Sequence, residues 1–173
     1  MKITSVTPIL NVSDVPASVI WFERIGWGRS FSWNDGGMIK RADLHNEHGP
    51  AKFAGLFATT PSTKPDSTPE TPPGSTPDST PDKTTGKAPP PMLFLCKDGQ
   101  GARDPRPCLD PASDKYGGVW LSWWVESVDT AHAACVAAGV EIVRPPKTEP
   151  WGVREFLIRH PDGHYFRISS HEA

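Results

Sequence analysis

Cysteine is scarce in this chain of 173 residues, which has three cysteines and no CxxC pair. An odd number without paired spacing argues against both a disulfide framework and a zinc or redox motif. Reduced thiols are typical of the cytoplasm. We therefore expect a cytoplasmic protein in which Cys96 and Cys135 are buried.

Three further features are missing, and each absence excludes a class of function. No apolar run approaches the roughly 20 residues of a membrane span. The first ten residues, MKITSVTPIL, have no long apolar region and no cleavage signal, so we expect no secretory peptide. The formal net charge of -2 provides no basic surplus for binding nucleic acid. These absences predict a protein whose partner is neither a membrane nor a nucleic acid.

Proline, in contrast, is abundant, and half of it lies in one segment. Residues 59–91 hold ten of the twenty prolines, repeat a DSTP unit and contain no aliphatic or aromatic side chain larger than alanine. Such a segment has nothing to bury and stays solvated, partly as polyproline II. We expect a flexible insertion within a single domain. A Pro-rich motif that binds a partner is the alternative.

The sequence on either side of this segment predicts strands and one helix. Asp14 supplies an N-cap, Pro16 fits the first helical turn, and Gly26 ends the helix. Alternating and β-rich stretches predict four strands, at 3–12, 29–33, 51–58 and 92–96. Residues 38–50 stay undecided between strand and loop.

The second half repeats the same plan. Ser127 caps a helix that runs to Ala138 and ends at Gly139. Strands are predicted at 119–125, 141–143, 153–159 and 164–169. Pro145-Pro146 ends the strand at 141–143, and a tight turn at Asp162-Gly163 joins the last two strands.

The two halves superpose at a constant offset of 113 residues. Asp14 matches Ser127, Phe22 matches Cys135, and Gly26 matches Gly139. Caps, apolar positions and terminators that fall in step indicate a duplicated β-α-β-β-β unit. The predicted fold is α+β, with residues 1–58 and 92–97 as one βαβββ module, 119–171 as the second, and both curled around a pocket.

Three stretches carry a family resemblance: VTPILNVSDVPASVIWFERIGW at 6–27, LSWWVESVDTAHAACVAAGVEIV at 121–143 and EPWGVREFLIRHPDGHYFRIS at 149–169. Together they resemble the glyoxalase/bleomycin-resistance/extradiol-dioxygenase superfamily, the vicinal oxygen chelate proteins. The resemblance implies two modules side by side around a concave pocket. In the family's enzymes, His, Glu or Gln side chains from the first and last strands of each half hold a divalent metal there.

The corresponding positions in this sequence do not suit a metal. They are Thr7, Trp120, Arg167 and a residue near Phe94. None offers the carboxylate or imidazole that such cations prefer, and Arg167 would add a permanent positive charge. We therefore expect no metal and no cofactor. The family's isomerase and dioxygenase reactions, which run through the metal, are disfavoured.

Strand alternation predicts what the pocket holds instead. If Trp120 faces the pocket, so do Ser122 and Trp124, whereas Trp123 packs under a helix. Aromatic walls with a few polar groups are typical of a small-molecule site. We identify no catalytic residue. The candidate ligand-binding residues are Trp33, Trp120, Ser122, Trp124, Trp151, Arg154, Tyr165 and Arg167.

Tryptophan and histidine can also be structural. We expect Trp21 and Trp123 to be core residues and His132 to be partly buried. We expect His160 and His164, beside the predicted turn, to be exposed. No His–Asp–nucleophile set is visible.

The resemblance and the pocket chemistry together favour a metal-free binding protein of the bleomycin-resistance type, one that sequesters an antibiotic-like molecule in a tryptophan-lined pocket of a homodimer. The alternative is a glyoxalase- or dioxygenase-like enzyme, a lyase or oxidoreductase, with a non-standard metal site. Its candidate acid–base groups would be His164, Glu155 and Glu126. An interaction protein that acts through residues 59–91 is the third hypothesis.

Overall fold

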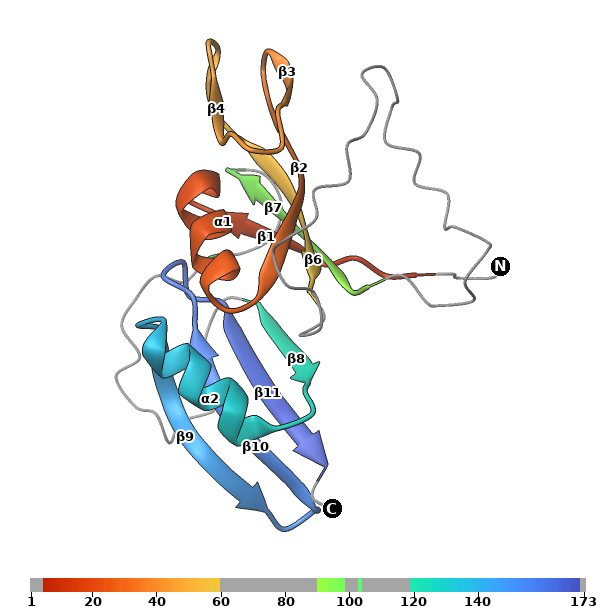
Figure 1. Cartoon of the computed structure of the whole chain (residues 1–173), viewed down its shortest axis with the longest axis vertical. Helices are drawn as coiled ribbons and strands as arrows, with labels where there is room; N and C mark the ends of the chain where they lie inside the picture. The colour runs from red at the N-terminus through yellow and green to blue at the C-terminus, as the bar shows by residue number, and fades with distance from the viewer. Residues whose placement is uncertain (1–4, 60–89, 99–102, 104–118, 172–173) are drawn as a thin grey trace.

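The computed structural model describes residues 5–59, 90–98, 103 and 119–171, which form two main β-sheets, each with one helix packed on it, and one two-stranded ribbon (Figure 1). The predicted α+β class is confirmed, since both sheets mix parallel and antiparallel pairs. Cys108 and nearly all of the predicted insertion at 59–91 lie outside the described residues.

The first sheet has five strands in the order β1-β7-β6-β2-β3. β1 pairs parallel with β7, and the other pairs are antiparallel. A short ribbon, β4–β5, lies in the stretch that the sequence left undecided. The elements are β1 (Ile9–Val12), α1 (Val15–Arg24), β2 (Trp27–Asn34), β3 (Gly37–Ile39), β4 (His45–Asn46), β5 (Gly49–Pro50), β6 (Phe53–Ala58) and β7 (Met92–Lys97).

The second sheet has four strands in the order β8-β11-β10-β9. Its first strand in sequence, β8, again pairs parallel with the last, β11, and the remaining pairs are antiparallel. The arrangement of the first half is therefore repeated. The elements are β8 (Trp120–Trp124), α2 (Val128–Ala137), β9 (Glu141–Glu149), β10 (Val153–Arg159) and β11 (Tyr165–His171).

The helices confirm the offset of 113 residues. α1 spans residues 15–24 and α2 spans 128–137. The Asp14 carboxylate accepts from the backbone N–H of Ala17 at 2.8 Å, and the Ser127 hydroxyl accepts from that of Thr130 at 3.3 Å. Gly26 and Gly139 follow the helices with φ of +90° and +69°, a left-handed conformation that favours glycine. Both helices are thus started and ended by equivalent residues.

The predicted end of the strand at 141–143 is wrong, because β9 continues through both prolines to Glu149. β9 is an edge strand, so one side of it needs no partner. Arg144 pairs with Leu157 and Lys147 with Glu155, and the register shifts between these pairs. Pro145 and Pro146 lie at this irregularity, where a missing N–H removes no sheet hydrogen bond.

The two halves pack together where α1 meets the turn between β10 and β11 (Figure 1). The Trp21 and His160 rings meet edge to face at 4.9 Å, and Phe22 lies 5.6 Å from Phe166. Asp162 accepts from the backbone N–H of Ser13 at 3.0 Å. The expected core role of Trp21, 9% exposed, is confirmed.

The histidines beside this turn are buried, so the prediction that they are exposed is wrong. His160 is 1% exposed and His164 is fully buried. The His164 Nε2 atom lies 2.7 Å from the carbonyl oxygen of Asn11, in the first module. The turn is covered because the other half of the chain packs on it, which its local sequence does not reveal.

Candidate functional site

The face of the second sheet that points away from α2 gathers most of the candidate residues. α2 covers the opposite face, where His132 contacts Phe156. His132 is half-buried there, as predicted. We call the side away from α2 the second-sheet face, where Trp124 is exposed but Leu157, Tyr165 and Ser169 are buried. Reading across β8, β11 and β10, its rows are Trp120–Tyr165–Arg159, Ser122–Arg167–Leu157 and Trp124–Ser169–Glu155.

Trp120 is at the centre of an aromatic and charged group on this face. Its ring stacks on Tyr165, with centroids 5.2 Å apart and planes at 19°. The Arg167 guanidinium lies 5.9 Å from the Trp120 centroid. The Glu155 carboxylate forms an ion pair with the same guanidinium, 3.7 Å from Arg167 Nε. The group offers a flat ring beside a cation with N–H donors.

Trp124 provides a second flat surface on the same face. It is 57% exposed and stacks on His171, with centroids 4.5 Å apart and planes at 18°. Ser122, between the two tryptophans in the strand, is exposed and presents a hydroxyl. The structure thus brings five of the eight candidates together: Trp120, Ser122, Trp124, Tyr165 and Arg167.

Arg154 does not belong to this group. It forms an ion pair with Asp129 of α2 at 2.8 Å and donates to Thr148 of β9 at 3.4 Å. The side chain therefore points to the helix-covered face, opposite Arg167. Strand alternation separates the two arginines, since they lie on registered strands with Arg154 opposite Ser170 and Arg167 opposite Leu157. The structure therefore does not bring Arg154, a predicted ligand-binding residue, together with Arg167.

The two remaining tryptophans lie elsewhere. Trp151 is 66% exposed in the turn between β9 and β10. Trp33 is on β2 of the first sheet, 43% exposed. Neither has a ring contact with Trp120 or Trp124 among the described interactions.

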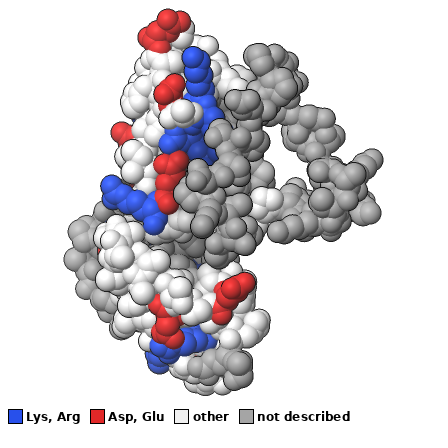
Figure 2. Space-filling model, in the orientation of Figure 1, with Lys and Arg blue, Asp and Glu red and all other residues white. Residues whose placement is uncertain are grey.

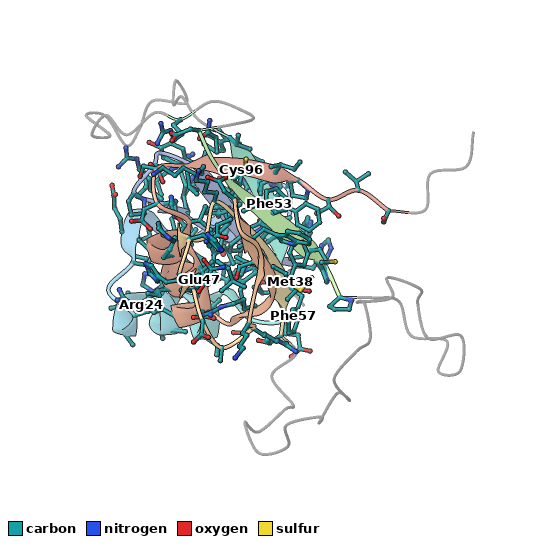
Figure 3. All side chains as sticks on the ribbon, turned by 90° about the horizontal axis from the view of Figure 1, so that it is seen from above. Arg24, Met38, Glu47, Phe53, Phe57 and Cys96 are labelled. Carbon is teal, nitrogen blue, oxygen red and sulfur yellow. The ribbon has the colours of Figure 1, made fainter. Side chains whose placement is uncertain are left out.

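Trp33 instead borders an aromatic surface that the sequence analysis missed. The Phe31, Phe53 and Phe94 rings lie with centroids 5.4 to 6.1 Å apart on the first-sheet side that α1 does not cover. Figure 3 shows Phe53 with Phe57, Met38 and the half-buried Cys96, away from Arg24 at the end of α1. We call this the first-sheet face. Alternation along the strands would have identified it, as it did for the second sheet.

Register pairing locates the positions that hold metal in related enzymes. In the first sheet, Phe94 lies opposite Ile9, and in the second sheet Arg167 lies opposite Ser122. Ser122 is the equivalent of Ile9, since it lies 113 residues later. Phe94 is therefore the equivalent of Arg167. Together with Thr7 and Trp120, these side chains include no carboxylate, imidazole or thiolate, so they do not fit a divalent metal. Among the described residues, no group of three His, Cys, Asp or Glu side chains could hold a metal ion.

The histidines at the turn do not supply an acid–base group on either face. Burial lowers the pKa of His160 to about 4, although the nearby Asp162 carboxylate opposes the shift. Burial also lowers the pKa of His164, opposed by its hydrogen bond to the Asn11 carbonyl. His160 Nε2 has no hydrogen-bond partner among the described residues. Both rings are therefore neutral structural groups at pH 7.

The charged residues do not form a patch of one sign on the side of the molecule seen in Figure 2, where blue and red groups alternate. This distribution agrees with the absence of a basic surplus in the sequence. In the described part of the chain, neither helix has the length and apolar character needed to cross a bilayer.

Solved structures with the same fold cover almost the whole chain. TioX from Micromonospora sp. ML1 aligns with a TM-score of 0.56 at 19% identity, covering 97% of this chain and 99% of that one. A glyoxalase-related enzyme from Clostridium phytofermentans gives 0.56 at 18%, covering 99% and 98%. A bleomycin-binding protein complexed with bleomycin gives 0.50 at 17%, covering 98% and 100%. At these identities the structural matches establish the fold alone.

Sequence comparison gives the family. No curated protein matches the chain. The profile of the Glyoxalase/Bleomycin resistance protein/Dioxygenase superfamily, however, matches residues 2–168, nearly the full length. The chain belongs to the glyoxalase/bleomycin resistance protein/dioxygenase superfamily.

Proposed function

We propose that this protein binds a flat, antibiotic-like aromatic molecule on the second-sheet face and sequesters it without a metal. The observation that carries the proposal is the group formed by Trp120, Tyr165 and Arg167. An aromatic platform and a guanidinium occupy two positions where related enzymes place metal ligands. A ring stacked on Trp120 would leave its amide, carboxylate or phosphate oxygens within reach of Arg167.

Two structural neighbours represent the two kinds of activity to be compared. One is a bleomycin-binding protein in complex with bleomycin, and another is a glyoxalase-related enzyme. The side chains at Thr7, Phe94, Trp120 and Arg167 favour the first kind of activity, because metal-dependent chemistry needs donors that these residues lack. Stacking and hydrogen bonding need only the groups that are present.

The binding site is completed, we propose, by a second copy of the chain. The hollow between Arg167 and the strands β9 and β10, which Trp120 and Tyr165 do not line, has a volume of about 190 Å³. Pockets for drug-sized molecules are usually about 300–1,000 Å³, so one face alone is too shallow. The first-sheet face, with Phe31, Phe53 and Trp33, is an apolar surface suited to close it from the partner protomer.

A thermal-shift screen tests this function. Bleomycin and planar heteroaromatic antibiotics are tested beside Zn²⁺, Ni²⁺, Mn²⁺ and Fe²⁺, since a ligand that binds only the native state raises the melting temperature. We expect stabilisation by at least one aromatic compound and none by the metals. Stabilisation by a metal alone would instead favour an enzyme with a non-standard metal site.

Variants then locate the site for any compound that binds. Trp120→Ala should weaken binding by roughly 1–3 kcal/mol, the scale of a lost stacking platform. Arg167→Ala should weaken binding of compounds that carry acceptor oxygens. Arg154→Ala is the matched control, because this arginine lies on the helix-covered face and pairs with Asp129. Equal losses for both arginine variants would contradict the assignment of the second-sheet face.

A further inference from the structure

A cavity of about 530 Å³ lies between the two halves at the edge strand β8, mostly on the side of the second sheet that α2 covers. Its walls come from α2, from β8 and from the first module near Trp27 and Met92. None of its described lining residues is charged, and Ser122 is the only one with a hydroxyl. We call it the inter-module cavity. It shares Ser122 and Trp124 with the second-sheet face, but Trp120, Tyr165 and Arg167, which carry the function proposed above, do not line it.

The duplication explains why this space is hollow. At the offset of 113, Trp21 and Phe22 of α1 correspond to Ala134 and Cys135 of α2. On α1, the two large rings pack against Phe166, with centroids 5.8 and 5.6 Å away. On α2, the side chains at the same positions are small.

The surface opposite the small residues is equivalent as well. Because Phe94 is the register equivalent of Arg167, Leu93 is the equivalent of Phe166. Leu93 lines the inter-module cavity together with Ala134 and Cys135. The cavity is therefore the place where, in the other half, an indole and a phenyl ring fill the space between helix and sheet.

We infer that the inter-module cavity is a second ligand site, which takes an uncharged aromatic molecule of one to three rings. Such a molecule would replace the rings that α2 lacks, as apolar cavities left by missing side chains bind small aromatic compounds. Trp27 and Trp123, whose centroids are 5.2 Å apart, would supply its aromatic walls. This site stands independently of the proposed function.

The charge of the ligand follows from the lining. A charged group would lose its hydration and find no partner among the described lining residues, which makes its burial costly. The Cys135 thiol also stays neutral, because burial raises its pKa to about 11. A neutral ring system loses little hydration and gains contact with apolar walls.

The test uses N-phenyl-1-naphthylamine, a neutral probe whose fluorescence rises in apolar surroundings, with 8-anilinonaphthalene-1-sulfonate as its charged counterpart. We expect one equivalent of the neutral probe to bind per chain, with at least tenfold weaker binding of the sulfonate. Failure of the full chain to bind the neutral probe would overturn the inference. Binding that appears only after residues 60–89 are replaced by a short loop would also overturn it, because the chain itself would then occupy the cavity.

A pair of neighbouring variants locates the probe. Ala134→Phe restores a ring at a cavity-lining position, and Ala134 is exposed enough to accept it without disturbing the core. We expect this variant to bind the probe at least tenfold more weakly. Ala133→Phe adds the same ring to an exposed residue of the same helix outside the described lining, and it should bind normally. Equal binding by the two variants would refute the location.

Trp120→Ala separates this site from the proposed function. It removes the platform of the second-sheet face but lies outside the cavity lining. We expect it to leave probe affinity unchanged, and a tenfold loss would overturn the assignment to the cavity. Circular dichroism of each variant confirms that the fold is retained before affinities are compared.

Discussion

Substitution of the neighbouring residues Trp123 and Trp124 tests how the second sheet is oriented. Trp123 points toward the core, with its ring 4.4 Å from Phe166 and 5.2 Å from Trp27. Trp124 points to the second-sheet face, is 57% exposed and also borders the inter-module cavity. Trp123→Ala should therefore destabilise the fold, and Trp124→Ala should chiefly affect ligand binding.

The size of the effect follows from the surroundings of each ring. Replacing a large core aromatic residue by alanine costs about 3–5 kcal/mol. Trp123 also borders the inter-module cavity, so it lacks neighbours on one side, and we expect the lower end, about 3 kcal/mol. In a chain of this length each kcal/mol lowers the melting temperature by about 2–4 °C, which gives a decrease of about 6–12 °C. Trp124→Ala should cost less than about 1 kcal/mol, because its ring is mostly exposed.

Thermal and urea denaturation followed by circular dichroism measure both stabilities, and a ligand titration measures the binding effect. Trp124→Ala should weaken binding at the second-sheet face by roughly 1–3 kcal/mol. A destabilising Trp124→Ala beside a mild Trp123→Ala would mean that the strand register is wrong by one residue. Every assignment along β8 would then reverse.

Three further outcomes are expected. Because the pKa of His160 is about 4 in the folded chain and 6.5 ordinarily, the unfolded chain binds more protons between these values. The contribution of His160 to the free energy of unfolding is therefore fully present above pH 6.5 and falls by up to about 3 kcal/mol toward pH 4. In urea denaturation across this range, the stability of His160→Gln should depend less steeply on pH than that of the unmodified chain. An equal pH dependence would contradict the assignment. Replacing residues 60–89 by a short Gly/Ser loop should change stability by no more than about 1 kcal/mol, since Ala58 already donates to Pro91 at 2.9 Å; a larger loss in thermal denaturation would show that the segment packs on the domain. Light scattering at micromolar concentration should give the mass of a dimer, and a monomer mass would refute the shared site.

Local features of the sequence predicted the helices well. The caps at Asp14 and Ser127 and the glycines at 26 and 139 act within a few residues of where they lie, so the residues themselves specify the helix limits. Alternation likewise separated Trp123 from its neighbour Trp124, because the side-chain period of a strand is a local property.

Features that depend on distant parts of the chain were mispredicted. His160 and His164 flank a turn that would be exposed in an isolated hairpin, but α1 and β1 of the other half cover it. Two consecutive prolines end most strands. β9 tolerates Pro145 and Pro146 because it is an edge strand with an irregular register. Arg154 was named as a ligand-binding candidate on its residue type, and its ion pair with Asp129 of α2, which the sequence does not reveal, places it apart from Arg167.

The central claim is that the site acts without a metal, and metal analysis tests it most directly. The protein is purified without chelators, and bound Zn, Ni, Mn and Fe are measured by mass spectrometry before and after addition of each ion. Because Thr7, Phe94, Trp120 and Arg167 provide no suitable donor set, we predict far less than one equivalent of any of these metals per chain. One tightly bound equivalent would contradict the account.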